Sequence, residues 1–303
     1  MKNPKPRIHL VLGSGGARGI VHIGVIRGLE ASGFTISSIT GCSMGAVVGG
    51  MYSAGHLDIY ETWLHTLTRG KVWGFLDLTL TKQGFVKGEK VLAQLREFAG
   101  EQSIENLRIP FSAVATDLLQ RQEVVYRSGD LYKALRASIG IPGVFTPVAE
   151  EGSFLVDGGV LNPLPLNHVL RQPGELVVAV HLNGHPAALV PAAKRETIDP
   201  DKGTPAESWL SRFLPTTNTT KKSSSQDINY SIVDLLSTSY DFTAYRMVEL
   251  MQQLHPADIF IDIPRNICGA FDFHKAAALI DAGKEAWENA YERYKGYQSI
   301  TSS

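Results

Sequence analysis

The sequence predicts an α/β fold with three layers (α/β/α), in which helices cover both faces of a mostly parallel central sheet. Short apolar runs that end in glycine are typical of buried parallel strands, and the first such run spans residues 8–13. Segments with helical spacing follow these runs, so strand and helix alternate in the order β-α-β-α. Sheets of this kind bind ligands at the carboxyl ends of their strands, where Gly13 and Gly41 fall.

The individual elements follow from the pattern in chain order. After the first strand, apolar residues recur at helical spacing from Gly19 to Ala31. A β-branched run at 34–40 predicts the second strand, and small residues from Ser43 to Ala54 predict the second helix. Further strands are expected at 111–117, 123–127, 154–157, 176–182 and 258–263, and further helices at 134–140, at 231–254 and from about His274 to Tyr294.

Residues 60–86 form a less regular apolar stretch that contains Trp63, Trp73 and Phe75. Two interpretations are open: helices that cover the core, or an apolar rim beside a site. Because aromatic side chains are more often packing residues, we favour the core interpretation.

The composition changes between residues 186 and 229, where prolines, serines and threonines gather and predict a flexible insertion. Within it, the segment WLSRFL at 209–214 is a short apolar island. A strand is expected again after the insertion, so we interpret the chain as a single domain over 7–295 that the insertion interrupts. Residues 1–6 and 296–303 are expected to be tails.

Composition and charge exclude several classes of function. The 303 residues carry a formal net charge of −1, which argues against a nucleic-acid partner. The two cysteines, Cys42 and Cys268, lie far apart in the sequence, without the spacing of metal ligands, and a disulfide framework is not expected. The start of the chain lacks the apolar segment of a signal peptide, and no apolar run approaches the ~18 residues that span a bilayer. We therefore expect a cytoplasmic protein, at most peripheral to a membrane, and the sequence does not indicate its oligomeric state.

A glycine-rich loop, GSGGARG at 13–19, follows the first strand and precedes a helix. Glycines there let the backbone approach a ligand and direct N–H groups at negative charge. A dinucleotide-binding loop would need glycine at Arg18 and an acid about twenty residues later, and neither condition is met. An oxyanion cradle and a structural glycine turn remain as alternatives.

The segment GCSMG at 41–45 matches the pattern G-x-S-x-G. In a nucleophile elbow, a tight turn between strand and helix exposes the serine, and glycines on either side make room for the turn. The alternative is a serine that caps a helix among glycines. The position of Ser43 between a predicted strand and a predicted helix, with Gly41 and Gly45 around it, favours the elbow.

An apolar strand at 154–157 ends in Asp157 and is followed by Gly158 and Gly159. An Asp-Gly pair is common in simple turns. A serine nucleophile, however, needs a base within hydrogen-bond reach, and a carboxylate at a strand end can serve as that base.

In this order, the three stretches resemble the motifs of the patatin-like phospholipase family: SGGARG at 14–19, GCSMG at 41–45 and DGG at 157–159. The block RASIGIPGVFTPV at 136–148 also resembles the family, and the resemblance covers residues 7–182. Ser14 departs from the family pattern, in which many relatives have glycine.

The resemblance implies a patatin-like fold and a function. Ser43 would be the nucleophile and Asp157 the base of a two-residue dyad, with no histidine. Gly15 and Gly16 would donate N–H groups to the oxyanion, while Arg18 and Gly19 would support the loop. The implied reaction is hydrolysis of a lipid or small acyl ester through an acyl-enzyme, without metal or cofactor.

Two other functions stay open. A Ser-His-Asp esterase of the α/β-hydrolase type shares the elbow and would need a histidine later in the chain. The candidates are His168, His181, His185, His255 and His274. A non-catalytic module that binds a lipid or an anion in the glycine loop is the other alternative.

Overall fold

The computed structural model describes residues 6–75, 77–81, 84–150, 152–169, 171–186 and 232–301. Most of the predicted insertion, including the island at 209–214, lies outside these ranges. None of the helices in the described ranges is both long enough and apolar enough to span a membrane.

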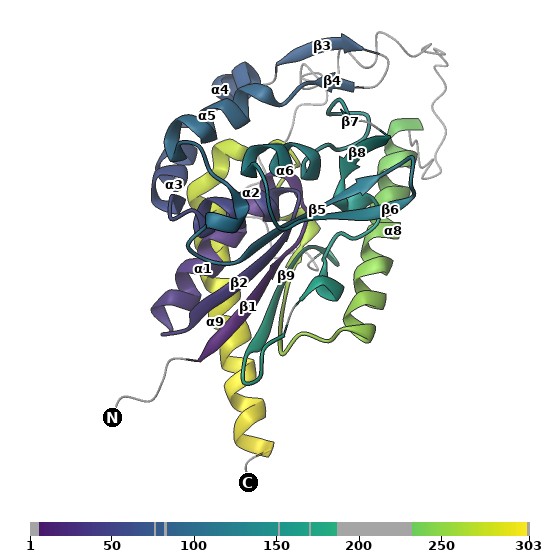
Figure 1. The fold of residues 1–303 in the computed structure, drawn as a ribbon. Coiled ribbons are helices and arrows are strands. Elements are labelled where there is room, and N and C mark those ends of the chain that lie inside the picture. The colour runs from purple at the N-terminus through teal and green to yellow at the C-terminus, as the bar shows by residue number, and fades with distance from the viewer. Residues whose placement is uncertain are drawn as a thin grey trace, which may run out of the picture.

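An eight-stranded mixed sheet forms the centre of the fold, in the order β10-β9-β1-β2-β5-β8-β7, with β6 also paired to β5 (Figure 1). The parallel part confirms the predicted fold class and consists of β1 (Arg7–Leu12), β2 (Thr35–Cys42), β5 (Phe111–Asp117), β9 (Leu176–Gly184) and β10 (Ile259–Pro264). The antiparallel part consists of β6 (Gln122–Tyr126), β7 (Val148–Glu150) and β8 (Ser153–Asp157).

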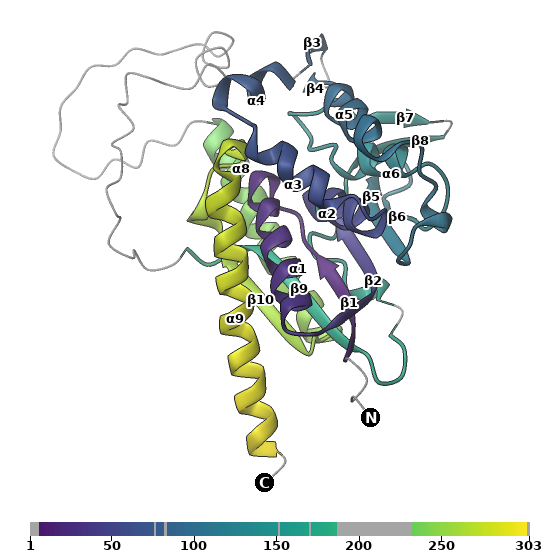
Figure 2. The ribbon, with the colours of Figure 1, turned by 90° about the vertical axis from the view of Figure 1, so that its left-hand side faces the viewer.

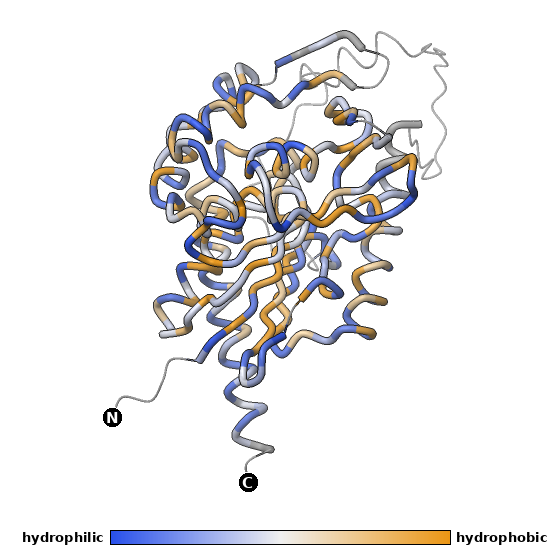
Figure 3. The backbone as a smooth tube through the Cα atoms, in the orientation of Figure 1, coloured by the Kyte–Doolittle hydropathy of each residue, from blue (hydrophilic) through white to orange (hydrophobic). Residues whose placement is uncertain are grey.

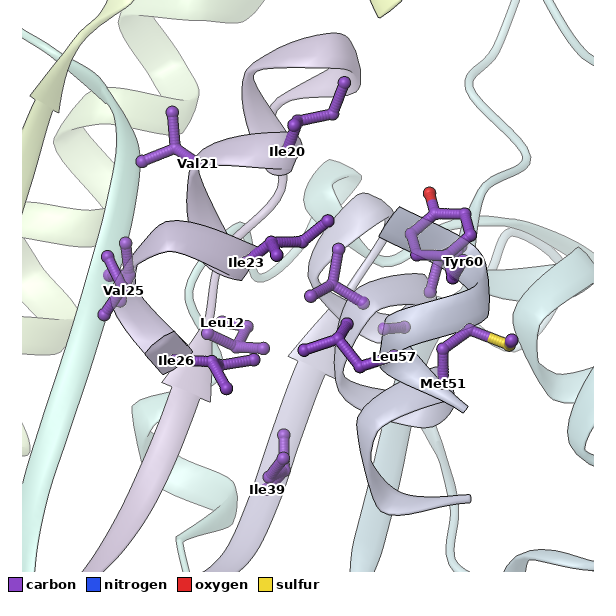
Figure 4. Close-up of a cluster of buried hydrophobic side chains, with 14 of the residues drawn as sticks. Leu12, Ile20, Val21, Ile23, Val25, Ile26, Ile39, Met51, Leu57 and Tyr60 are labelled. Carbon is purple, nitrogen blue, oxygen red and sulfur yellow. The ribbon is translucent and has the colours of Figure 1, made fainter. Parts of the chain in front are cut away.

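Helices lie on both faces of this sheet. Successive side chains of a strand point to opposite faces, and in these strands the side chains on both faces are apolar and need to be covered. Leu10 of β1 packs into the main core with α1 (Val21–Ala31) and α2 (Met44–Ser53), whereas its neighbour Val11 packs with Val248 of α8 (Ile232–Leu254) on the opposite face. Figure 2 shows the last helix, α9 (Ala276–Thr301), alongside α1. The apolar colour in Figure 3 is concentrated on the central strands, and Figure 4 shows side chains of β1, β2 and the first helices meeting in the core.

Two predicted boundaries differ from the structure. The helix expected from Gly19 begins instead as a 3-10 turn over Gly16–Ile20, and α1 starts at Val21. The last helix does not end at Tyr294 but continues to Thr301, through residues that were expected to be a tail. Gly296 weakens a helix but does not stop it, and no proline follows.

The irregular stretch at 60–86 contains α3 (Leu57–His65), α4 (Arg69–Phe75) and a small hairpin of β3 (Leu78–Thr81) and β4 (Gly84–Val86). The helix α5 (Glu89–Ala99) follows. Trp63 packs edge-on against Phe75 and Phe98 and stacks with Tyr60. Part of the stretch at 60–86 therefore covers the core, as the first interpretation expects. The same helices also line a cavity beside Ser43, as described below, so both interpretations of this stretch hold.

The pairing along β5 brings two distant strand ends together. One edge of β5 pairs with β6 over Ala113–Asp117. On its other edge, β2 occupies the first half, up to the pair Cys42–Val114, and β8 occupies the second half, from the pair Asp157–Ala115. Because β8 runs antiparallel to β5, the strands β2 and β8 point at each other in line, and their carboxyl ends meet.

Candidate active site

Ser43 directly follows β2 and adopts φ 55° and ψ −123°, a positive-φ backbone conformation that L-residues rarely adopt. Such a conformation costs on the order of 1–3 kcal/mol and needs support from its surroundings. The support comes from Ser138 of α6 (Leu131–Ser138): its Oγ accepts the Ser43 N–H at 2.9 Å and donates to the Val114 carbonyl at 2.6 Å. Ser43 thus lies on a tight turn, or elbow, between β2 and α2.

The two glycines of the elbow are required by close packing. A Cβ on Gly41 would lie 2.6 Å from backbone atoms of Ala46, and a Cβ on Gly45 would collide with the Leu12 carbonyl of β1. The start of α2 thus lies directly against the ends of β1 and β2. This position aims the helix N-terminus, with its partial positive charge, at the space around Ser43.

Ser43 and Asp157 meet at the junction of β2 and β8. The Ser43 Oγ donates a hydrogen bond of 2.5 Å to Asp157 Oδ2, and both residues are buried, at 3% and 2% exposure. The second carboxylate oxygen accepts the Gly159 N–H at 2.7 Å. Burial raises the pKa of Asp157 to about 6, although the hydrogen bonds from Ser43 and Gly159 act in the opposite direction.

The glycine loop approaches the same space from the end of β1. Gly16 adopts φ +57° and faces the cavity that Ser43 also lines. Gly15 packs so closely on Leu182 that a Cβ would lie 2.7 Å from the leucine Cβ. Within the described part of the chain, the N–H groups of Gly15 and Gly16 donate to no protein acceptor. Two free donors beside a serine fit the chemistry of an oxyanion hole.

Arg18 lies behind the loop and does not contact Ser43 or Asp157. Its guanidinium donates to Asn183 Oδ1 at 2.8 Å and to the Arg265 carbonyl at 3.2 Å. The Asn183 amide in turn donates to the Ser14 carbonyl at 3.1 Å, so Arg18 ties the glycine loop to the end of β9. A Cβ on Gly19 would collide with the Met44 side chain, so this glycine lets the turn after the loop pack against α2.

An apolar cavity of about 110 Å³ opens at Ser43 and Gly16. Side chains from α3, α4, α5 and the segment before α9 line it, among them Trp63, Val72, Val91 and Phe271. Apart from Ser43, the side chains that line the cavity are nearly all apolar. The cavity therefore fits a hydrocarbon group that is attached to a reactive atom next to the Ser43 hydroxyl.

No histidine in the described ranges contacts either Ser43 or Asp157. His168 pairs with Glu123, His181 with Asp262, and His274 accepts from Arg69. The same ranges hold no cluster of three or more His, Cys, Asp or Glu side chains suited to a metal ion.

The sequence did not single out three residues that matter at this site. Ser138 and Asn183 support the elbow and the loop, and Tyr240 of α8 comes close to Gly159. Ser138 lies inside the block that resembles the family, which is a usable signal. Asn183 and Tyr240 carry no local pattern, because each acquires its role from packing between distant segments.

Together, the sheet, the helices on both faces and the strained serine define an α/β protein with a serine on a tight elbow between strand and helix. A family model described as patatin-like phospholipase matches residues 10–170. An NTE family protein of Mycobacterium tuberculosis is 33% identical over 341 aligned residues, which cover 96% of this chain and 92% of the relative. The chain belongs to the patatin-like phospholipase family.

Other similar proteins are larger. Lysophospholipase NTE1 of Pyricularia oryzae is 34% identical over 178 residues, which cover 57% of this chain but only 12% of that protein. Among solved structures, VipD of Legionella pneumophila matches 96% of this chain and 67% of its own, with a TM-score of 0.44 and 13% identity.

Proposed function

We propose that this protein is a serine hydrolase that cleaves acyl esters of lipids through a Ser43–Asp157 dyad and an acyl-enzyme intermediate. One observation carries the proposal: a serine on a strained elbow donates a 2.5 Å hydrogen bond to a buried carboxylate and opens onto an apolar cavity. Family membership supports lipid ester hydrolysis, and fungal relatives named lysophospholipases support phospholipids or lysophospholipids as substrates.

The geometry suggests how the reaction proceeds. The Asp157 carboxylate accepts the Ser43 proton while Oγ attacks the ester carbonyl carbon, and the N–H groups of Gly15 and Gly16 stabilise the oxyanion. The protonated Asp157 then donates to the leaving alcohol as the acyl-enzyme forms. In the second half, Asp157 takes a proton from water, which attacks the acyl carbon. Collapse releases the carboxylic acid and returns the proton to Ser43.

The experiment compares wild-type protein with Ser43→Ala on a panel of simple esters, lysophospholipids and phospholipids. Hydrolysis should fall roughly 10³- to 10⁶-fold, because removal of the nucleophile removes the acyl-enzyme route. Ser53→Ala, at a buried serine on the far end of α2, is the matched control and should leave hydrolysis unchanged. A fluorophosphonate probe should label wild type and Ser53→Ala but not Ser43→Ala.

Two results would contradict this proposal. If the wild-type protein neither reacts with the probe nor cleaves any ester, the non-catalytic binding module becomes the better account. If replacing a single histidine by glutamine abolishes turnover in a folded protein, a Ser-His-Asp triad operates instead of the dyad.

A further inference from the structure

Three polar atoms gather around Gly159, on the side of Asp157 that does not face Ser43. The Ser14 Oγ, the Tyr240 hydroxyl and Asp157 Oδ1 each lie 3.0 Å from the position that a Cβ on Gly159 would occupy. Ser14 is half-buried, and Tyr240 is 40% exposed as a whole residue although its hydroxyl end lies in buried surroundings near Asp157. Among the residues that the structure describes, neither hydroxyl has a hydrogen-bond partner.

Tyr240 is held in this position by the network behind the glycine loop. Its neighbour Asp241 forms an ion pair of 2.8 Å with Arg265, whose carbonyl accepts from Arg18. The helix α8 is thereby connected to the same arginine that fixes the loop. Burial and the nearby Asp157 raise the pKa of Tyr240, so the phenol is a neutral donor at neutral pH.

This polar group is separate from the lining of the apolar cavity. The cavity is lined by Gly16 and Ser43, but not by Ser14, Asp157 or Tyr240. The acyl chain has its place in the cavity, whereas the alcohol must leave next to the acid that protonates it. In the proposed mechanism that acid is Asp157, so the alcohol part of the ester lies beside the Ser14 and Tyr240 hydroxyls.

We propose that Ser14 and Tyr240 bind the alcohol part of the substrate, and that the enzyme selects acyl esters of a glycerol-type alcohol with free hydroxyl groups. This inference rests on the proposed function. Hydroxyl groups next to the ester oxygen form hydrogen bonds with the two side chains, and an apolar alcohol leaves both unpaired. Ser14, where many family members have glycine, contributes one of these two contacts.

The test uses two substrates with the same acyl chain, monooctanoylglycerol and propyl octanoate, which differ only in the hydroxyl groups of the alcohol. Tyr240→Phe should lower kcat/KM for the glycerol ester about 3- to 10-fold, the effect of one neutral hydrogen bond, and leave the propyl ester unchanged. Ser14→Ala should have the same selective effect. Tyr245→Phe, on the same helix but packed against His185, is the matched control and should alter neither rate.

The labelling rate of Ser43 by a fluorophosphonate that carries a simple alkoxy group checks that the variants retain the fold and the nucleophile. Equal losses on both esters, or no loss on either, would overturn the inference while the proposed function stands. If the wild-type protein cleaves neither ester nor any lipid, the proposed function fails and this inference with it.

Discussion

Asp157 is buried, at 2% exposure, and in the proposed mechanism it acts as the base. Burial weakens the charged form and brings the pKa to about 6, which makes the carboxylate a stronger base than an exposed aspartate. Ser43 and Gly159 donate hydrogen bonds to the carboxylate, which stabilise its charged form and limit the rise in its pKa. The kcat/KM of the wild type should therefore rise with pH through an acid limb near pH 6 and level off above it.

Asp157→Asn separates the activity of this group from its effect on stability. The variant keeps the shape but cannot accept the serine proton, so it should cost nearly as much activity as Ser43→Ala, and the double mutant should be little worse. The folded-state pKa lies above the ordinary 3.8, so the folded protein binds this proton more tightly than the unfolded chain. The free energy of unfolding of the wild type should therefore fall, relative to the variant, as the pH rises from 3.8 to about 6.

This fall in the free energy of unfolding, relative to the variant, amounts to about 3 kcal/mol at most. Urea denaturation of both proteins at about pH 4 and about pH 7 measures it, since contributions from other groups cancel in the difference. A parallel pH dependence in the two proteins would show that Asp157 is not the buried charge described here.

Gly16 tests the glycine loop at the same scale. An alanine at this position would have to keep φ +57°, and its Cβ would lie 2.9 Å from the Ala270 carbonyl oxygen. Gly16→Ala should therefore displace the N–H groups of the loop. Because an oxyanion forms only in the transition state, kcat should fall about 100- to 1,000-fold while KM changes little. Steady-state kinetics measure kcat and KM, and thermal unfolding checks that the variant is folded. An unchanged kcat would show that the loop does not stabilise an oxyanion.

At the scale of elements, the active site depends on β2 and β8 meeting in line on one edge of β5. The sequence could indicate Ser43 and Asp157 separately, because each lies at the end of an apolar run and has glycines next to it. It could not show that β8 runs antiparallel to the rest, since the apolar pattern of a strand does not record its direction. The resemblance to a family supplied the link between the two residues that residue-by-residue reasoning left as alternatives.

The contact between α1 and α9 is a second feature that local patterns do not reveal. A Cβ on Gly283 of α9 would collide with the Val21 carbonyl of α1, and a Cβ on Gly24 would collide with the Ile280 carbonyl. Gly283→Ala should therefore lower the free energy of unfolding by about 1–3 kcal/mol, as overpacking does. Gly296→Ala is the matched control on the same helix: nothing lies within 4 Å, and it should stabilise the protein by up to about 1 kcal/mol. Urea titration of both variants measures this, and equal effects would exclude a close helix contact.

At the scale of the whole molecule, the cavity brings together parts of the chain that the sequence does not connect. Ser43 lies on the elbow, Val72 on α4 and Phe271 just before α9, yet all three line the same space. Apolar composition alone suggested either a core or a rim for residues 60–86, because both require the same side chains. The choice depends on whether the packed helices leave a gap, and that is decided by the three-dimensional arrangement of the side chains.

If this cavity holds the acyl chain, filling it should change the preferred chain length. Val91 of α5 is half-buried and lines the cavity, so Val91→Trp should lower kcat/KM for long-chain esters at least about 10-fold relative to short-chain esters, whose acyl group stays near Ser43. Ala93→Trp, at an exposed position on the same helix outside this cavity, adds the same bulk and should leave the ratio unchanged. The ratio of kcat/KM for octanoyl and acetyl esters measures the effect. A loss that is equal for both chain lengths in Val91→Trp would place the acyl chain elsewhere, because a blocked cavity has to discriminate by length.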